Sequence, residues 1–242
     1  MMNEYILSDE TRDKLRKVST ASVATALYKR GIRNQFVQGV TPVERKAVTM
    51  VGQAYTLRYI PAREDRNPIT VFRNRDHKQR VAVENCPKGH VLVMDARKDS
   101  RAATAGSILI TRLQERGVEG VVSDGGVRDA AGIGALDMPA YFARPSAPTN
   151  LTLHEAIDLN VPISCGDAPV FPGDVMLGDG DGVMVIPAHL ADEIAAECLE
   201  MEAYEDFVLE QVNDGAGIIG LYPGTDDESI VKFNAWREKT GR

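Results

Sequence analysis

The sequence predicts a mixed α/β domain built in layers. Helix-like and strand-like segments alternate through the middle of the chain, and several short strand-like segments follow over residues 161–186. The chain has 242 residues, of which 43% are hydrophobic, so it can bury a large core. No linker of distinct composition divides it, and we therefore expect one domain over residues 1–242.

Composition argues against several classes of protein. The formal net charge is −7, which disfavours a broad nucleic-acid-binding surface. The spacing of Cys86, Cys165 and Cys198 fits neither a disulfide framework nor a zinc knuckle. No apolar run approaches the roughly 20 residues that span a bilayer. Residues 1–17 lack the apolar core of a signal peptide. We therefore expect a cytoplasmic protein that binds neither nucleic acid nor membrane.

The N-terminal part of the chain predicts two short helices and then a strand. Ser8 is a suitable helix N-cap, and apolar residues recur at helical spacing over residues 8–30, with a break near Ser19. Gly31 is a suitable helix stop. Residues 48–59 (VTMVGQAYTLRY) are rich in β-branched and aromatic side chains, which favours a strand.

A polar and basic insertion follows at about residues 58–80. It contains two prolines, and its cations include Arg63, Arg66, Arg73, Arg75 and Lys78. One interpretation is a solvent-exposed loop with a short helix. The other is a lid whose cations face an anionic substrate.

The second half of the chain continues the alternation. Residues 90–95 (HVLVMD) and 118–123 (VEGVVS) favour buried strands, and residues 106–116 (GSILITRLQER) have helical spacing. Further on we expect a short helix and strand over 135–142, an amphipathic Glu-rich helix over 187–213, and a helical C-terminal tail.

The most informative stretch is residues 106–132, where a helix, a buried strand and an expected Gly-rich turn follow one another. The turn would carry Asp124, Arg128 and Asp129 outside the carboxyl end of the strand, where ligands commonly bind. A guanidinium fits a carboxylate or an oxyanion, and a carboxylate suits Mg²⁺ or Mn²⁺. The helix start at Gly106 offers free amides to a substrate carboxylate. A surface ion pair is the alternative interpretation of Arg128 and Asp129.

Several motifs together resemble one known family. They are STASVATALYKRG, MVGQAYTLR, KGHVLVMDA, GVEGVVSDGGVRD and PISCGDAPVFPGDVMLGDGDGVMVIP. The family contains the regulator of ribonuclease activity A and the class II pyruvate aldolases that act on 4-hydroxy-4-methyl-2-oxoglutarate. The resemblance implies a layered α/β/β/α sandwich, similar to the swivelling phosphohistidine-like domain. It also implies a homotrimer or homohexamer with sites between subunits.

The resemblance also implies roles for individual residues. Arg128 matches the arginine that holds the keto-acid oxygen and stabilises the enolate in the aldolases. Asp129 matches the aspartate that binds the divalent ion, Mg²⁺ or Mn²⁺. The substrate would contact the start of the preceding helix, at Gly106, Ser107, Ile108 and Leu109.

Two departures from the aldolase motif affect this assignment. The motif has an acidic residue, then twenty residues, then Arg-Asp, which places Ser107 where the aldolases carry the acid. A later acid is also missing, because residues 130–136 read AAGIGAL. Asp124 could compensate as a catalytic group that holds water, or it could only stabilise the turn.

We expect a divalent-metal-dependent lyase, an aldolase or decarboxylase, that acts on a small 2-oxo acid through a pyruvate-type enolate. One alternative is a dehydratase or hydratase of a 2-keto-3-deoxy sugar acid. The other is a non-catalytic regulatory module that binds a partner such as a ribonuclease. The two missing acids favour this last alternative, whereas the retained Arg128 and Asp129 favour an enzyme.

Overall fold

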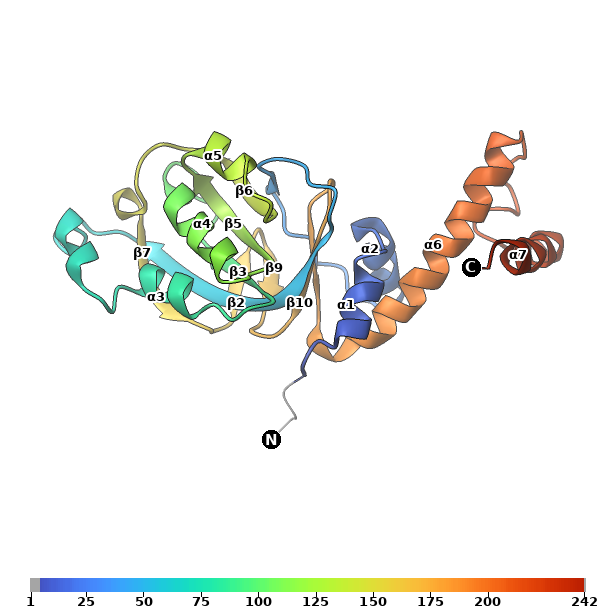
Figure 1. Ribbon diagram of the computed structural model, residues 1–242, viewed down its shortest axis with the longest axis horizontal. Helices are drawn as coiled ribbons and strands as arrows, with labels where there is room; N and C mark the ends of the chain where they lie inside the picture. Colours follow the sequence, from blue (N-terminus) through green and yellow to red (C-terminus); the bar gives the residue numbers. More distant parts are fainter. Residues whose placement is uncertain (1–4, 242) are drawn as a thin grey trace.

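A mixed β-sheet forms the centre of the computed structural model, and helices cover it (Figure 1). The structure describes residues 5–241. Residues 1–4 and 242 of the expected 1–242 domain lie outside the described residues. The strand order is β1 (Thr41–Pro42), β6 (Ala140–Pro145), β5 (Gly120–Val127), β3 (His90–Asp95), β2 (Met50–Pro61), β10 (Val175–Gly178) and β11 (Val183–Ile186). Two further strands join it: β4 (Ala103–Ala105) pairs with β5, and β7 (His154–Leu159) pairs with β2. The expected mixed α/β fold is confirmed.

The parallel part of the sheet explains the apolar runs in the sequence. β2, β3, β5 and β6 pair in parallel, and every residue of β5 is buried. Parallel strands need crossover connections, which here are α4 (Ser107–Glu115) between β4 and β5 and α5 (Ala130–Gly134) between β5 and β6. Together with α3 (Lys78–Asn85), these helices cover one face of the sheet (Figure 1).

Alternate side chains of the same strands pack on the opposite face. Leu92 and Val121 contribute to the cluster beneath α3 and α4, whereas Val93 and Val122 belong to a second cluster. A small hairpin of β8 (Ile163–Cys165) and β9 (Ala168–Val170) contributes to that second cluster. The core therefore lies in layers on both sides of the central strands.

The N-terminal helices begin where the sequence predicts. Ser8 Oγ accepts a hydrogen bond from Thr11 N at the start of α1 (Asp9–Leu15), and Ser19 caps α2 (Thr20–Lys29) in the same way. Gly31 follows α2 with a φ of +78°. α1 and α2 pack against α6 (Ala191–Asn213), the Glu-rich helix, which a 3-10 turn (Ala188–Leu190) precedes.

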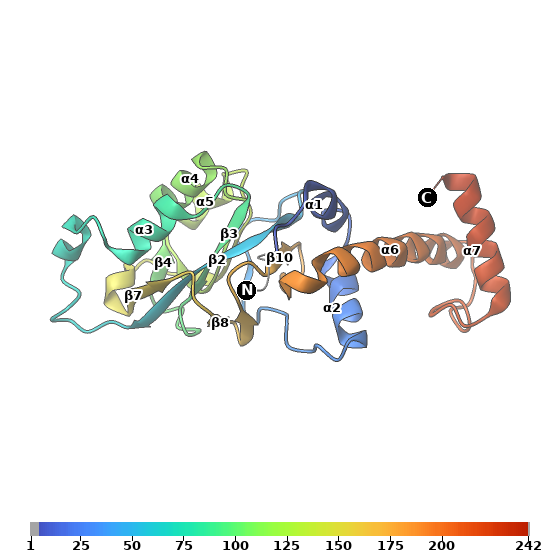
Figure 2. The same cartoon turned by 90° about the horizontal axis from the view of Figure 1, so that it is seen from below.

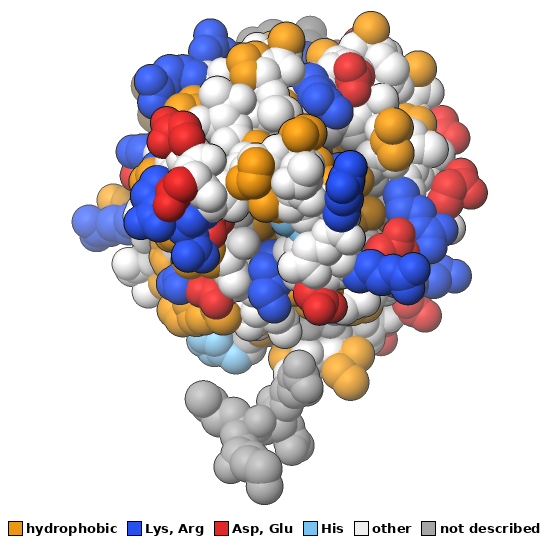
Figure 3. All heavy atoms as spheres, turned by 90° about the vertical axis from the view of Figure 1, so that its left-hand side faces the viewer, with side chains coloured by type: hydrophobic (Ala, Val, Ile, Leu, Met, Phe, Trp, Pro, Cys, Tyr) orange, Lys and Arg blue, Asp and Glu red, His pale blue; other side chains and the backbone are white. Residues whose placement is uncertain are grey.

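Two features extend from the sheet. The basic insertion forms a loop with a short 3-10 helix, η1 (Ile69–Arg73), at one end of the molecule, where Figure 3 shows Lys and Arg side chains around apolar ones. At the other end α6 projects away from the sheet, and α7 (Asp227–Thr240) packs at its tip, which gives the chain an elongated outline (Figure 2). Within residues 5–241, no helix has both the length and the apolar character to cross a membrane.

The predicted Gly-rich turn after residue 123 is wrong, because β5 continues through it to Val127. Its glycines permit close packing. A Cβ at Gly125 would lie 2.6 Å from Thr104 Cγ2, and one at Gly126 would lie 2.7 Å from Ser146 Cβ. The strand therefore ends four residues later than expected, directly before Arg128.

Candidate active site

A pocket of about 190 Å³ lies where β4 and β5 end. Both strands run in the same direction, so their carboxyl ends meet at one edge of the sheet. The pocket brings together most residues that the sequence indicated: Gly106, Ile108, Leu109, Arg128 and Asp129 all line it. Ser107 lies between Gly106 and Ile108 and contacts Asp129.

Arg128 and Asp129 follow β5 and form the charged part of this pocket. Arg128 N donates to Ala105 O at 3.2 Å, which holds this segment against the end of β4. Asp129 has a φ of +60°, a left-handed conformation that aspartate tolerates better than most residues. Arg128 Nε is 3.9 Å from Asp129 Oδ2, and both side chains are about half exposed. This loose ion pair involves Nε, so the Nη1 and Nη2 groups of Arg128 are available to a ligand.

Ser107 positions the Asp129 carboxylate. Its backbone N and its Oγ both donate to Asp129 Oδ2, each at 3.1 Å. Within residues 5–241, neither Asp129 Oδ1 nor the Ile108 amide has a hydrogen-bond partner. One acceptor and one helix N-terminal donor therefore remain free beside the pocket.

Gly106 occupies a position that a side chain would disturb. A Cβ there would lie 2.8 Å from Arg128 Nε and 2.9 Å from Asp129 Oδ2. We therefore expect Gly106→Ala to displace both charged groups. Oxalate is a small dicarboxylate that a guanidinium can bind, and titration calorimetry should show its affinity reduced roughly 10- to 100-fold. Gly132→Ala on α5 is the matched control, because its Cβ would meet Ser107 Cβ at an ordinary 3.7 Å. Equal affinity in the two variants would contradict this account.

Asp124 does not line the pocket, so its predicted catalytic role is corrected here. Its side chain is 2% exposed and accepts hydrogen bonds from the backbone N–H groups of Ala96 (2.6 Å), Lys98 (3.0 Å) and Gly166 (3.1 Å). Burial raises the pKa of this carboxyl group above its usual value. The structure thus agrees with the alternative interpretation, in which Asp124 stabilises neighbouring loops.

Removing the Asp124 carboxylate should therefore reduce stability. We expect Asp124→Ala to lower the free energy of unfolding by about 3 kcal/mol, because three backbone N–H groups lose their acceptor. Urea unfolding followed by far-UV circular dichroism measures this loss. A loss within 0.5 kcal/mol of zero, the usual range for surface substitutions, would contradict the structural role.

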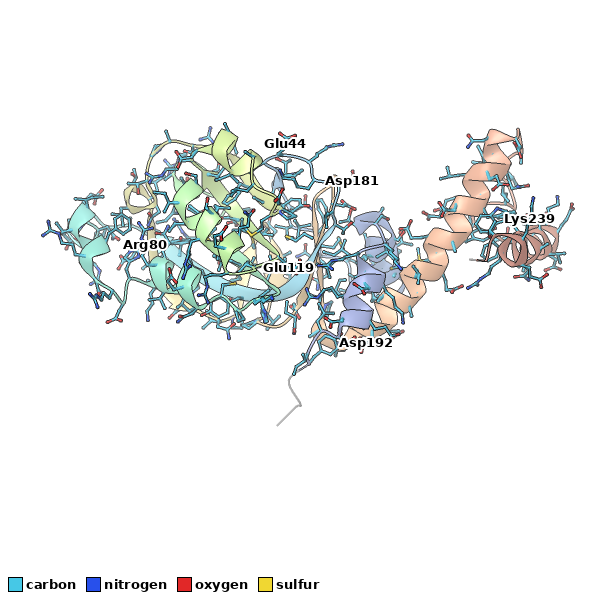
Figure 4. The ribbon with its side chains drawn as sticks, viewed as in Figure 1. Glu44, Arg80, Glu119, Asp181, Asp192 and Lys239 are labelled. Carbon is cyan, nitrogen blue, oxygen red and sulfur yellow. The ribbon has the colours of Figure 1, made fainter. Side chains whose placement is uncertain are left out.

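The sequence indicated the opposite wall of the pocket only through the interpretation of the insertion as a lid whose cations face an anionic substrate. This wall contains Phe72 from η1, and Gln79 and Arg80 from the start of α3. It also contains Asn150, the first residue of a 3-10 turn (Asn150–Thr152). Figure 4 labels Arg80 at the end of the molecule that carries the insertion. The only available signal was the basic character of residues 58–80, of which Arg80 is the last.

The acidic groups of the pocket limit how a metal ion could bind. Among residues 5–241 no group of three or more His, Cys, Asp or Glu side chains is arranged to hold an ion. Asp129 is the acidic residue that lines the pocket, and its Oδ1 is free. Mg²⁺ commonly binds through one or two carboxylates and completes its shell with water and substrate oxygens. The residues present fit an ion held in this way.

Comparisons with known proteins agree with the fold and with the motifs. A family model described as RraA-like, aldolase/RraA, matches residues 20–185. A Halalkalibacterium halodurans protein, provisionally named a 4-hydroxy-4-methyl-2-oxoglutarate aldolase, is 32% identical over 141 residues, which cover 58% of this chain and 67% of the relative.

Two solved structures share the architecture. Streptomyces coelicolor RraAS2, described as an unusual member of the RNase ES inhibitor RraA family, superposes with a TM-score of 0.74 at 27% identity, covering 83% of this chain and 96% of that one. A Pseudomonas syringae protein gives a TM-score of 0.76 at 22% identity, covering 89% and 98%. Because the family model spans more than half of the sequence, this chain belongs to the RraA-like, aldolase/RraA family.

Proposed function

We propose that this protein is a divalent-metal-dependent lyase that cleaves a carbon–carbon bond in a small 2-oxo acid and releases pyruvate. The observation that carries the proposal is the placement of Arg128 and Asp129 together at the N-terminus of α4, on one pocket. The aldolase name of the Halalkalibacterium halodurans relative supports the reaction class.

The substrate carboxylate would dock at the start of α4. This helix has nine residues, and its N-terminus carries a partial positive charge. The free Ile108 amide and the Arg128 guanidinium both supply hydrogen-bond donors there. Such a site would hold the 2-oxo acid end of the substrate and direct the remainder toward the opposite wall.

Arg128 would stabilise the charge that develops during bond cleavage. When a bond β to a ketone breaks, its electron pair moves toward the carbonyl oxygen and forms an enolate. A fixed guanidinium next to that oxygen favours the charged state and needs no reorganisation during the reaction. The loose ion pair with Asp129 leaves Arg128 free to do this.

Asp129 would hold the divalent ion through Oδ1 while Ser107 fixes Oδ2. When bound, the ion would supply Lewis acidity toward the 2-oxo group. In this proposal Ser107 orients the one protein carboxylate of the site and takes no proton itself.

Ser107 stands where the aldolases carry an acidic residue, and this difference affects which reaction the site would catalyse. Aldol cleavage needs a base that removes the proton of the substrate hydroxyl group, and a serine is a poor base. Decarboxylation of oxaloacetate needs no such base, because loss of CO₂ leaves the enolate directly. We therefore propose that decarboxylation is the faster reaction at this site.

A coupled assay of pyruvate release tests the function. Oxaloacetate and 4-hydroxy-4-methyl-2-oxoglutarate are each incubated with Mg²⁺, with Mn²⁺ and with EDTA, and spontaneous decay without protein is subtracted. Release that requires a metal and exceeds the spontaneous rate supports the proposal. No release above that rate with either metal overturns it, and a 2-keto-3-deoxy acid screen and a partner search would follow.

A further inference from the structure

A second cation, Arg80, faces the same pocket as Arg128. Its guanidinium lies over the Phe72 ring, with Cζ 4.5 Å from the ring centroid. It forms neither a hydrogen bond nor an ion pair with any residue in the range 5–241. Arg63 and Arg66 in the same insertion pair with Asp65 and Glu155. Arg73, Arg75 and Lys78 form no ion pair within the described residues but are exposed, whereas Arg80 is partly buried.

Arg80 carries an electrostatic cost that a bound anion would relieve. Burial, and then the positive charge of Arg128, both lower the pKa of Arg80 below its usual value. Arginine nevertheless stays protonated at neutral pH. Two guanidinium groups and one carboxylate, that of Asp129, therefore line the pocket, and an anionic ligand would compensate the excess positive charge.

Two buried amide side chains that line the pocket with Arg80 each have one atom without a hydrogen-bond partner. Asn150 is 4% exposed, and its Nδ2 donates no hydrogen bond within the described residues. Gln79 is 2% exposed, and its Nε2 donates to Thr104 O at 2.6 Å, whereas its Oε1 accepts nothing. Both atoms are shielded from solvent, so they make this wall polar without facing the ligand, and Arg80 is the charged group of the wall that lines the pocket.

We propose that Arg80 binds the distal carboxylate of the substrate and thereby sets the preference for dicarboxylic over monocarboxylic 2-oxo acids. The proximal 2-oxo acid end would lie at Arg128 and the start of α4, as the proposed function requires. Stacking on Phe72 holds the guanidinium plane, so its paired N–H groups can meet a carboxylate.

Binding of unreactive ligands tests this subsite directly. The affinities for 2-oxoglutarate, which has two carboxylates, and for 2-oxobutanoate, which has one, are measured by titration calorimetry in Mg²⁺. We expect Arg80→Gln to weaken 2-oxoglutarate binding roughly 10-fold or more and to leave 2-oxobutanoate binding within about 2-fold. Arg80→Lys keeps the charge but loses the planar fork, so its selective loss should be smaller.

Matched variants separate the possible outcomes. Arg75→Gln removes an exposed charge from the same insertion and should change neither affinity. Arg128→Ala should weaken both ligands, because both share the 2-oxo acid end. Equal weakening of the two ligands by Arg80→Gln, or none, overturns the subsite. Should Arg80→Gln not fold, Arg80→Lys decides, and an unchanged ratio of the two affinities overturns the subsite.

Failure of the subsite can be distinguished from failure of the proposed function. If the wild-type protein releases no pyruvate from oxaloacetate but Arg80→Gln selectively weakens 2-oxoglutarate binding, the reaction is wrong and the subsite stands. If the wild-type protein releases pyruvate but its ligand preference does not depend on Arg80, the subsite alone is wrong.

Discussion

Replacing Arg128 with alanine is expected to lower kcat/KM for oxaloacetate decarboxylation about 10²- to 10³-fold. Removing one preorganised donor from a developing oxyanion has effects of this size in other enzymes. The Arg128 side chain is about half exposed, and within residues 5–241 its one ion pair is the 3.9 Å contact with Asp129, so the fold should not depend on this side chain. The pyruvate-release assay measures the loss, and far-UV circular dichroism checks the fold.

Two further variants show whether the loss at residue 128 is specific. Arg75→Ala removes an equivalent charge from an exposed site and should retain wild-type turnover. Arg128→Lys keeps the charge without the planar fork, and we expect it to recover only part of the activity. Wild-type turnover by a folded Arg128→Ala protein would exclude the electrophilic role.

Replacing Asp129 with asparagine is expected to lower the affinity for Mn²⁺ by at least about 100-fold. Even residues that only support a metal ligand commonly cost 10- to 100-fold when replaced. Asparagine has nearly the same shape, and its amide oxygen can still accept from Ser107 N and Oγ, so the geometry around it should persist. Titration calorimetry with Mn²⁺ measures the change.

The control for Asp129 is a second acidic residue close in the sequence. Asp137 is exposed and does not line the pocket, so Asp137→Asn removes the same charge and should leave Mn²⁺ affinity unchanged. If Asp129→Asn binds Mn²⁺ as tightly as the wild-type protein, Asp129 is not a ligand. The metal would then have to bind elsewhere or not at all.

Local patterns predicted most elements of the fold. The periodicity of residues 106–116 corresponds to α4, and the β-branched run at 48–59 corresponds to β2. Both signals are local, because a helix face and a buried strand each leave a characteristic spacing of apolar residues. The Arg128–Asp129 pair was also predicted, because it follows a strand-like segment and matches the Arg-Asp motif of the aldolases.

Contacts between distant segments account for what the sequence did not predict. Gly125 and Gly126 suggested a turn, but Thr104 and Ser146 pack where their side chains would be, so the strand continues. The role of Asp124 depends on three amides that lie as far away as Gly166. Arg80 and Asn150 are 70 positions apart and meet only in the folded pocket. The expected Mg²⁺ or Mn²⁺ and the homotrimer or homohexamer stay predictions.

α6 and α7 form a helical arm that projects from the sheet, and the tip of this arm affects how unfolding of the protein can be followed. Phe207, Phe233 and Trp236 form a small aromatic cluster there, and Trp236 Nε1 donates to Glu210 Oε2 at 2.8 Å. Trp236 is the only tryptophan in the chain. Intrinsic tryptophan fluorescence therefore reports whether α6 and α7 remain docked, and it is silent on the sheet that carries the pocket. An emission change without loss of circular dichroism would mark separation of the arm.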